Sequence, residues 1–161
     1  MGFVRNSIAA IAATVIMHSF AASPASAQSA PFAGLAGAWS GAGTISLSDG
    51  SKERLRCKAT YRVSGDNALQ QSLRCASDSY KLELSSDVVS EGGRVSGSWS
   101  ETSRGVSGTV QGRANGGRVS VVVDAPGFTA NLTLTTTGNK QSVSIVSEGD
   151  IRNVSIAMNR S

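Results

Sequence analysis

The chain has few of the side chains on which most enzymes depend. Its 161 residues include one histidine, His18, and two cysteines, Cys57 and Cys75. His18 lies in an N-terminal segment that we expect to be removed, so the mature protein would have no histidine. This excludes serine–histidine and cysteine–histidine nucleophile pairs and removes the usual nitrogen ligands of zinc and haem. We therefore expect a protein that is not an enzyme and that holds no cofactor or metal.

Long apolar runs are also scarce, and the one that stands out is N-terminal. One positive charge at Arg5 precedes an apolar run over residues 8–22, and small residues at 25–27 then match what a signal peptidase reads. We expect a signal peptide over 1–27, cleavage before Gln28 and a periplasmic or secreted location, with an uncleaved anchor as the alternative. No other segment approaches the ~20 apolar residues of a transmembrane helix, so we expect no span after cleavage.

The charge is nearly balanced. The sequence has 15 basic and 11 acidic residues. Loss of residues 1–27 removes only Arg5 from this count and leaves 14 basic residues against 11. Nucleic-acid binding usually needs a strongly basic patch on a recognisable fold, so we expect no nucleic-acid partner.

From Gly37 onward the sequence is typical of β-structure. Short alternating segments rich in Val, Ser and Thr are separated by Gly, Asn and Asp, and no window has helical periodicity. Connections of two to five residues favour antiparallel neighbours, and closing such a meander into a barrel of 8–10 strands removes both exposed edges. We expect one all-β domain over 37–161, preceded by an extended lead-in over 28–36. The expected strands are 37–47, 53–64, 68–76, 79–89, 94–101, 105–113, 117–124, 127–136, 140–147 and 151–159.

The two cysteines lie symmetrically about a turn at residues 65–67. Folding the chain antiparallel about Asp66 places Cys57 opposite Cys75, with both sulfurs on the apolar face. In an exported chain two cysteines favour a structural disulfide over redox chemistry. The same register pairs Ala59 with Leu73, Tyr61 with Gln71 and Val63 with Leu69. Around 138–139 the pattern pairs Leu132 with Ile145 and Leu134 with Val143.

The first predicted strand begins Gly37-Ala38-Trp39. A Gly-x-Trp at this position resembles the opening of calycin-type barrels, the group that includes lipocalins and avidins. In that group the Trp closes one barrel end and an Arg from a late strand packs over it. The resemblance implies that Arg152 or Arg160 packs over Trp39 here. The alternative is an ordinary core tryptophan after a turn glycine.

Aromatic residues are few, and several fall on inward-facing positions. If the barrel is open, we expect a cup lined by Trp39, Tyr61, Tyr80, Trp99 and Phe128. Pairing the strands on either side of 102–104 sets Gly97 near Gly108 and Trp99 near Val106. The resulting gap predicts a small apolar pocket, or else a place where the strands bend.

The charged residues of the strands indicate one basic face. Two functions are open for it, contact with an anionic lipid or acidic protein surface, or a solvated wall that resists aggregation. We expect Glu83 and Glu101 to point outward, and no spacing indicates a catalytic carboxylate pair. The basic face comprises Arg54, Arg56, Lys58, Arg62 and Arg74.

These patterns together predict an exported, non-enzymatic barrel that binds a small apolar ligand or associates with the cell envelope. The alternative is a periplasmic inhibitor or interaction protein. It would act on a secreted enzyme or an envelope protein through its surface or through residues 28–36.

Overall fold

The computed structural model describes residues 30–161, and over this range the chain forms strands and turns alone. The expected signal peptide lies outside the described residues. Among residues 30–161 no helix is long and apolar enough to cross a membrane. The strands are β1 (Gly37–Leu47), β2 (Lys52–Ser64), β3 (Ala68–Ala76), β4 (Lys81–Glu91), β5 (Arg94–Glu101), β6 (Val106–Asn115), β7 (Arg118–Ala125), β8 (Phe128–Thr137), β9 (Lys140–Ser147) and β10 (Ile151–Arg160).

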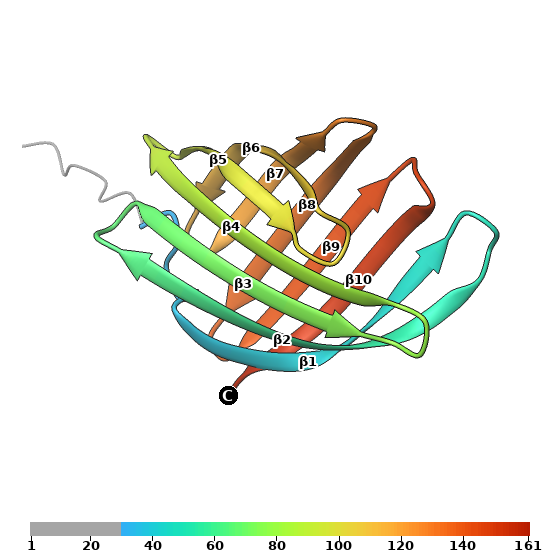
Figure 1. The fold of residues 1–161 in the computed structure, drawn as a ribbon. Helices are drawn as coiled ribbons and strands as arrows, with labels where there is room; N and C mark the ends of the chain where they lie inside the picture. Colours follow the sequence, from blue (N-terminus) through green and yellow to red (C-terminus); the bar gives the residue numbers. More distant parts are fainter. Residues whose placement is uncertain (1–29) are drawn as a thin grey trace, which may run out of the picture.

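The strands close into a barrel. Each strand pairs antiparallel with the next, and β1 also pairs with β10, from Trp39 opposite Arg160 to Leu47 opposite Ile151. Figure 1 shows the last strand returning to lie beside the first. Closure leaves no strand with unpaired backbone groups along its edge. The predicted all-β, up-and-down barrel is confirmed, with ten strands.

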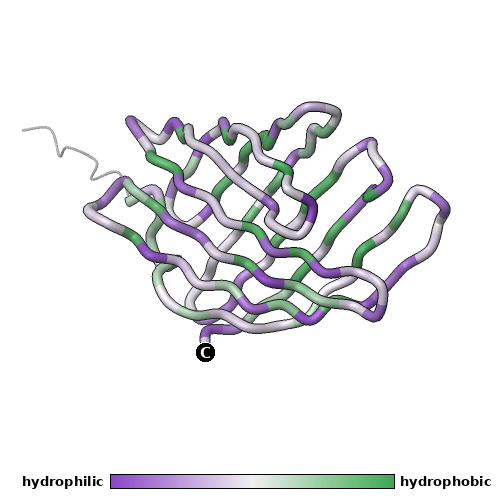
Figure 2. Tube along the Cα trace, viewed as in Figure 1, coloured by the Kyte–Doolittle hydropathy of each residue, from purple (hydrophilic) through white to green (hydrophobic). Residues whose placement is uncertain are grey.

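Alternating side chains give the wall an apolar inner face and a polar outer face. Figure 2 shows hydrophobic and hydrophilic residues alternating along the strands. The predicted registers of the β2–β3 and β8–β9 pairs are confirmed, including Tyr61 opposite Gln71 and Leu134 opposite Val143. A one-residue slip would turn each buried set outward, which is why the pattern specifies these registers.

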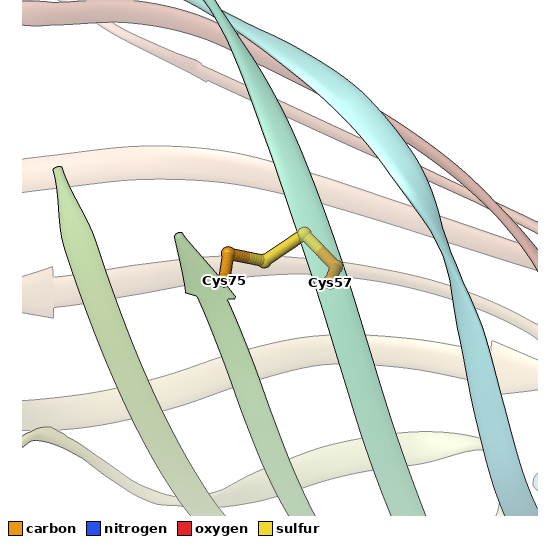
Figure 3. Close-up of a disulfide and its surroundings, with 2 residues drawn as sticks. All are labelled: Cys57 and Cys75. Carbon is orange, nitrogen blue, oxygen red and sulfur yellow. A yellow bond between two sulfur atoms is a disulfide. The ribbon is translucent and has the colours of Figure 1, made fainter. Parts of the chain in front are cut away.

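The predicted disulfide is also confirmed. Cys57 on β2 lies directly opposite Cys75 on β3, and a bond joins the two sulfur atoms (Figure 3). Both residues are buried in the core, at 3% and 4% exposure. The bond therefore links neighbouring strands on the inner face of the wall.

The β5–β6 register differs from the prediction. Trp99 lies opposite Gly108, and Gly97 lies opposite Val110, so the two glycines do not face each other. The reason is the length of the turn, which covers residues 102–105 because Gly105 takes a left-handed conformation with φ of 64°. The predicted strand included Gly105, and the predicted pairing of Trp99 with Val106 left a turn two residues shorter than the one observed.

One end of the barrel, here called the base, is closed by the segment before β1. Residues 31–35 form turns, with the Ala33 amide donating to the Ala30 carbonyl and the Leu35 amide to the Phe32 carbonyl. Phe32 and Leu35 are 2% and 0% exposed. The described part of the lead-in is thus turned and packed rather than extended, because burying each of these side chains contributes about 1.5–3 kcal/mol.

The opposite end, here called the mouth, is formed by alternate turns of the meander. In an antiparallel meander successive turns lie at opposite ends, so the turns after β1, β3, β5, β7 and β9 share the mouth. The turn after β6 lies at the base, where the Gly117 amide donates to the Pro31 carbonyl over 3.3 Å.

Candidate functional site

A cavity of about 450 Å³ lies inside the barrel and reaches the turns of the mouth. Its wall is mostly aliphatic, with side chains from β2 to β10. Small-molecule sites commonly have volumes of ≈ 300–1,000 Å³ and mostly apolar walls. Representative lining residues are Leu73, Val95, Val121, Leu132, Val143 and Val154.

Four of the five aromatic residues expected to line a cup border this cavity, namely Tyr61, Tyr80, Trp99 and Phe128. Tyr80 lies in the turn before β4, at the mouth, instead of within the strand. The fifth, Trp39, is not among the lining residues and is 1% exposed.

Trp99 and Phe128 meet although two strands separate β5 from β8. Their ring centroids are 5.9 Å apart, with planes inclined by 60° in an edge-to-face contact. The intervening positions are small. Trp99 is paired with Gly108, Phe128 with Ala125, and a Cβ at Gly108 would lie 3.0 Å from the Ala125 Cβ. The small pair leaves room for the two rings to form an aromatic part of the cavity wall.

The mouth carries a buried carboxylate, that of Glu101, for which the prediction of an outward position is wrong. Glu101 is 4% exposed and points inward, because it lies two residues after the inward-facing Trp99 on the same strand. Its carboxylate accepts hydrogen bonds from the backbone amides of Glu83 at 3.0 Å, Ser103 at 3.2 Å and Arg104 at 2.7 Å. Burial acts to raise the pKa of Glu101, but these hydrogen bonds outweigh it and lower that pKa below its ordinary value.

Arg104 completes the polar part of the mouth, and no motif in the sequence indicated it. Its guanidinium lies 3.9 Å from a Glu101 carboxylate oxygen and 5.0 Å from the centroid of the Tyr80 ring. Asp150, from the turn before β10, also lines the cavity at this end. Among the lining residues of the described chain, these two carboxylates and one guanidinium are the charged groups.

The base is sealed around Trp39. The indole nitrogen donates to the Leu35 carbonyl over 2.8 Å, and the guanidinium carbon of Arg160 lies 4.3 Å from the indole centroid. Arg160 also donates to the Gly34 carbonyl at 2.6 Å and to the Ala36 carbonyl. Of the two arginines that the resemblance suggested, the structure places Arg160 over Trp39.

Arg152, the second candidate, lies near the start of β10, at the mouth and therefore at the opposite end of the barrel from Trp39. Its guanidinium donates to the Glu148 carbonyl over 2.8 Å.

A short polar chain lies beside this seal. The Tyr61 hydroxyl donates to Gln141 Oε1 over 2.8 Å, and Gln141 Nε2 donates to Thr136 Oγ1 over 3.1 Å. Burial raises the pKa of Tyr61, so its hydroxyl stays protonated and remains a donor. These bonds satisfy the buried polar side chains of Tyr61, Gln141 and Thr136, whereas Ser90 Oγ, which is buried near the same end, has no partner in the described chain.

The predicted basic face lies on the exposed outer surface of β2 and β3. Lys58 is paired with Arg74, and Arg74 Nε lies 3.9 Å from Glu83 Oε1 in a solvent-exposed ion pair. Exposed pairs of this kind contribute little to stability. The face is separate from the cavity. Its residues, all exposed, are Arg54, Arg56, Lys58, Arg62 and Arg74.

Within residues 30–161 there is no cluster of three or more His, Cys, Asp or Glu side chains that could hold a metal ion. The described cavity therefore offers apolar contacts, a few hydrogen-bonding groups and a charged mouth.

Comparison with known proteins supports the fold alone. No family model matches the chain, and no curated protein matches it. Among solved structures, the chain is similar to Rv2717c from M. tuberculosis, with a TM-score of 0.64 and 13% identity over 79% of this chain and 92% of that one. It is also similar to the S-type phycobiliprotein lyase CPES from Guillardia theta, with a TM-score of 0.54 and 11% identity over 78% and 88% of the two chains. This chain therefore has the calycin-like barrel fold that its opening residues suggested.

Proposed function

We propose that this protein is an exported, non-enzymatic barrel that binds a small, mostly apolar ligand in its cavity. The observation that carries the proposal is the cavity of about 450 Å³, walled by aliphatic and aromatic side chains and sealed at the base by the Trp39–Arg160 contact. Burial of a ligand's apolar surface against such walls is favourable by roughly 25 cal/mol of transfer free energy per Å². The likeness to the phycobiliprotein lyase concerns the fold and does not identify a ligand for this chain.

The charged groups at the mouth favour binding over acid–base catalysis. Both Glu101 carboxylate oxygens accept backbone amide hydrogens, and the lowered pKa of Glu101 keeps it ionised at neutral pH. A carboxylate held in this way stabilises a turn and is poorly placed to give a proton to a substrate.

The interaction-protein alternative has less support. It assigned a role to residues 28–36, yet Phe32 and Leu35 of this segment are packed into the base.

Fluorescence of two single-tryptophan variants tests the binding proposal. Trp39→Phe leaves Trp99 in the cavity wall as reporter, and Trp99→Phe leaves Trp39 outside the lining. We expect a panel of fatty alcohols, sterols and small aromatics to include molecules that change Trp99 emission and leave Trp39 emission unchanged. If Trp99 emission responds to no member of the panel in a folded protein, the binding proposal fails.

A matched pair of valine variants on β7 locates the binding. Val121 lines the cavity and is 7% exposed, whereas its neighbour Val122 is 42% exposed. Val121→Phe should fill part of the cavity and abolish the Trp99 response, and Val122→Phe should leave it intact. Equal responses in the two variants would place the ligand elsewhere.

Export is the second part of the proposal. It is supported by the signal-like pattern over residues 1–27 and by the Cys57–Cys75 disulfide, which is a bond of oxidising compartments. We expect fractionation of a bacterial host to yield the protein in the periplasm or the medium. Its intact mass should match a chain that begins at Gln28 and contains the disulfide. A variant with Ala25 and Ala27 changed to arginine serves as the control and should retain the segment. Recovery of the unmodified wild-type chain from the cytosol, beginning at Met1, would contradict export.

A further inference from the structure

One row of polar side chains crosses the otherwise aliphatic cavity wall. Tyr61 on β2 is paired with Gln71 on β3, Gln71 with Ser86 on β4, and Ser86 with Trp99 on β5. All four residues line the cavity. We call these four residues the polar row.

The polar row leaves one buried hydrogen-bond donor, Trp99 Nε1, without a partner in the described chain. The Tyr61 hydroxyl donates to Gln141, and Ser86 Oγ donates to Gln71 Oε1 over 3.0 Å. Trp99 Nε1 is buried without a partner in the described chain, and the half-buried Gln71 has its amide oxygen held by Ser86 and borders the same cavity. A buried donor that has lost its hydrogen bonds to water and has no protein acceptor carries an uncompensated desolvation penalty.

We infer that the ligand carries a neutral hydrogen-bond acceptor, such as a ketone, ester or amide carbonyl, which is bound by two donors of the polar row, Gln71 Nε2 and the unpaired Trp99 Nε1. This inference rests on the proposed ligand-binding function and specifies the chemistry of the ligand. The Ser86 hydroxyl orients the Gln71 amide by holding its oxygen, so that the amide nitrogen is left to the cavity. The unpaired Trp99 N–H lies in the same row and is the second candidate donor.

The charges of the lining argue against an anionic group at this position. Arg104 is the one basic residue among the described lining residues, and it lies at the mouth beside Glu101. A carboxylate at Gln71 would be buried without a counter-ion, which is strongly unfavourable. A neutral carbonyl needs a single donor and carries no such penalty.

Two matched dyes test the inference. The first is 6-propionyl-2-(dimethylamino)naphthalene, which has a ketone, and the second is its 6-propyl analogue, which has none. The quantity to compare is the ratio of the two dissociation constants, because general hydrophobic differences between the dyes cancel when variants are compared. In Gln71→Met, which keeps the length of the side chain and removes the donor, we expect the preference for the ketone to fall about fivefold to tenfold relative to wild type.

The control is Gln70→Leu on the outer face of the same strand, where Gln70 donates to Asp87 over 2.9 Å. It should leave the ratio unchanged. Trp99→Phe keeps an aromatic ring in the wall and removes the second donor, and it provides an independent test if the Gln71 variant does not fold. We expect a fall in the ketone preference there as well.

The outcomes separate the inference from the function on which it rests. If wild type binds both dyes and the ratio is the same in folded Gln71→Met and Trp99→Phe, the acceptor inference is wrong and the ligand-binding function stands. If wild type binds neither dye, both the function and the inference are overturned. A fall in the ratio confined to the inner-face variants supports the inference.

Discussion

Removal of the Arg160 side chain should lower the stability of the barrel more than removal of the Arg152 side chain, the other arginine of β10. The guanidinium stacks on the buried Trp39 indole and donates to the carbonyls of Gly34 and Ala36. Arg160→Ala therefore removes the contacts that hold the segment before β1 against the barrel. Arg152→Ala is the matched control, since Arg152 lies on the same strand and donates to a single carbonyl, that of Glu148.

The magnitude follows from these contacts. A partly desolvated arginine over an indole contributes about 1 kcal/mol. Each hydrogen bond from a charged donor contributes about 1.5 kcal/mol at the lower end of the range, which applies because Arg160 is only half-buried. The free energy of unfolding should fall by about 2–4 kcal/mol in Arg160→Ala and by less than about 1 kcal/mol in Arg152→Ala. Arg160→Lys keeps the charge but not the planar fork, so its loss should lie between the two.

Equilibrium unfolding in urea, followed by tryptophan fluorescence, measures this difference. With a slope of about 2 kcal/mol per molar urea, the midpoint of Arg160→Ala should fall by roughly 1–2 M. The slope itself should not change. If Arg160→Ala and Arg152→Ala lose the same stability, the contacts over Trp39 do not hold the base, and the reasoning fails.

Three further predictions concern the wall and the mouth. In Gly108→Ala the new Cβ would lie 1.8 Å from a backbone carbonyl oxygen of β7. Calorimetry should show a loss of about 3 kcal/mol or more, whereas Gly149→Ala, with open space around it, should change stability by less than about 0.5 kcal/mol. The lowered pKa of Glu101 implies stability that is complete above its ordinary value of 4.5 and is lost as pH falls through the folded-state value. Glu101→Gln should be less stable at neutral pH and show a flatter decline in urea midpoint below pH 4.5; an unchanged acid profile would refute this role. Replacing Cys57 and Cys75 by alanine should reduce stability by about 3 kcal/mol on the chain-entropy model for a separation of 18 residues, and wild type in reducing agent should lose a similar amount.

The strand registers that were predicted correctly are those in which a one-residue shift would be energetically unfavourable for the side chains. In β2 the inward positions from Leu55 to Val63 are apolar and the outward positions are largely charged, so a one-residue shift would bury arginine. The turn at residues 65–67 then left a single register that paired Cys57 with Cys75.

The β5–β6 register was less predictable because a two-residue slip keeps every side chain on its own face. Around Gly97 and Gly108 the strands are rich in serine and glycine, so the slipped pairing costs little burial. The turn length decides between the two registers, and it depends on Gly105 adopting a positive φ. A two-residue periodicity contains no information on that choice.

The misplacement of Glu101 has a different cause. A charged residue at a strand end is most often exposed, and the sequence offers no apparent partner for a buried one. The three amides that compensate its burial belong to the neighbouring strand and to the following turn, and only the folded chain brings them to one carboxylate.

The alternation of side chains predicts which residues point inward but not how far along the barrel they lie. Trp39 and Trp99 both face the interior, yet Trp39 belongs to the seal of the base and Trp99 to the cavity wall. Gln71 shows the same limit, because its pairing with Tyr61 was predicted and its place beside a cavity was not. Depth depends on strand tilt and on which end is closed, and both are properties of the whole barrel.

The same distinction explains how one barrel interior can hold both a packed core and a cavity. At the base, large side chains such as Trp39, Phe32 and Met158 fill the space and are fully buried. Above them, the inward positions of β7 and β9 carry valine and isoleucine, which are too short to reach across the barrel, and the cavity remains. Because the base is sealed by the segment before β1, exchange of a ligand has to pass the mouth. On the proposed ligand-binding function, Glu101, Arg104 and Asp150 are the charged groups at the entrance, and the neutral polar row beneath them is the proposed determinant of which ligand binds.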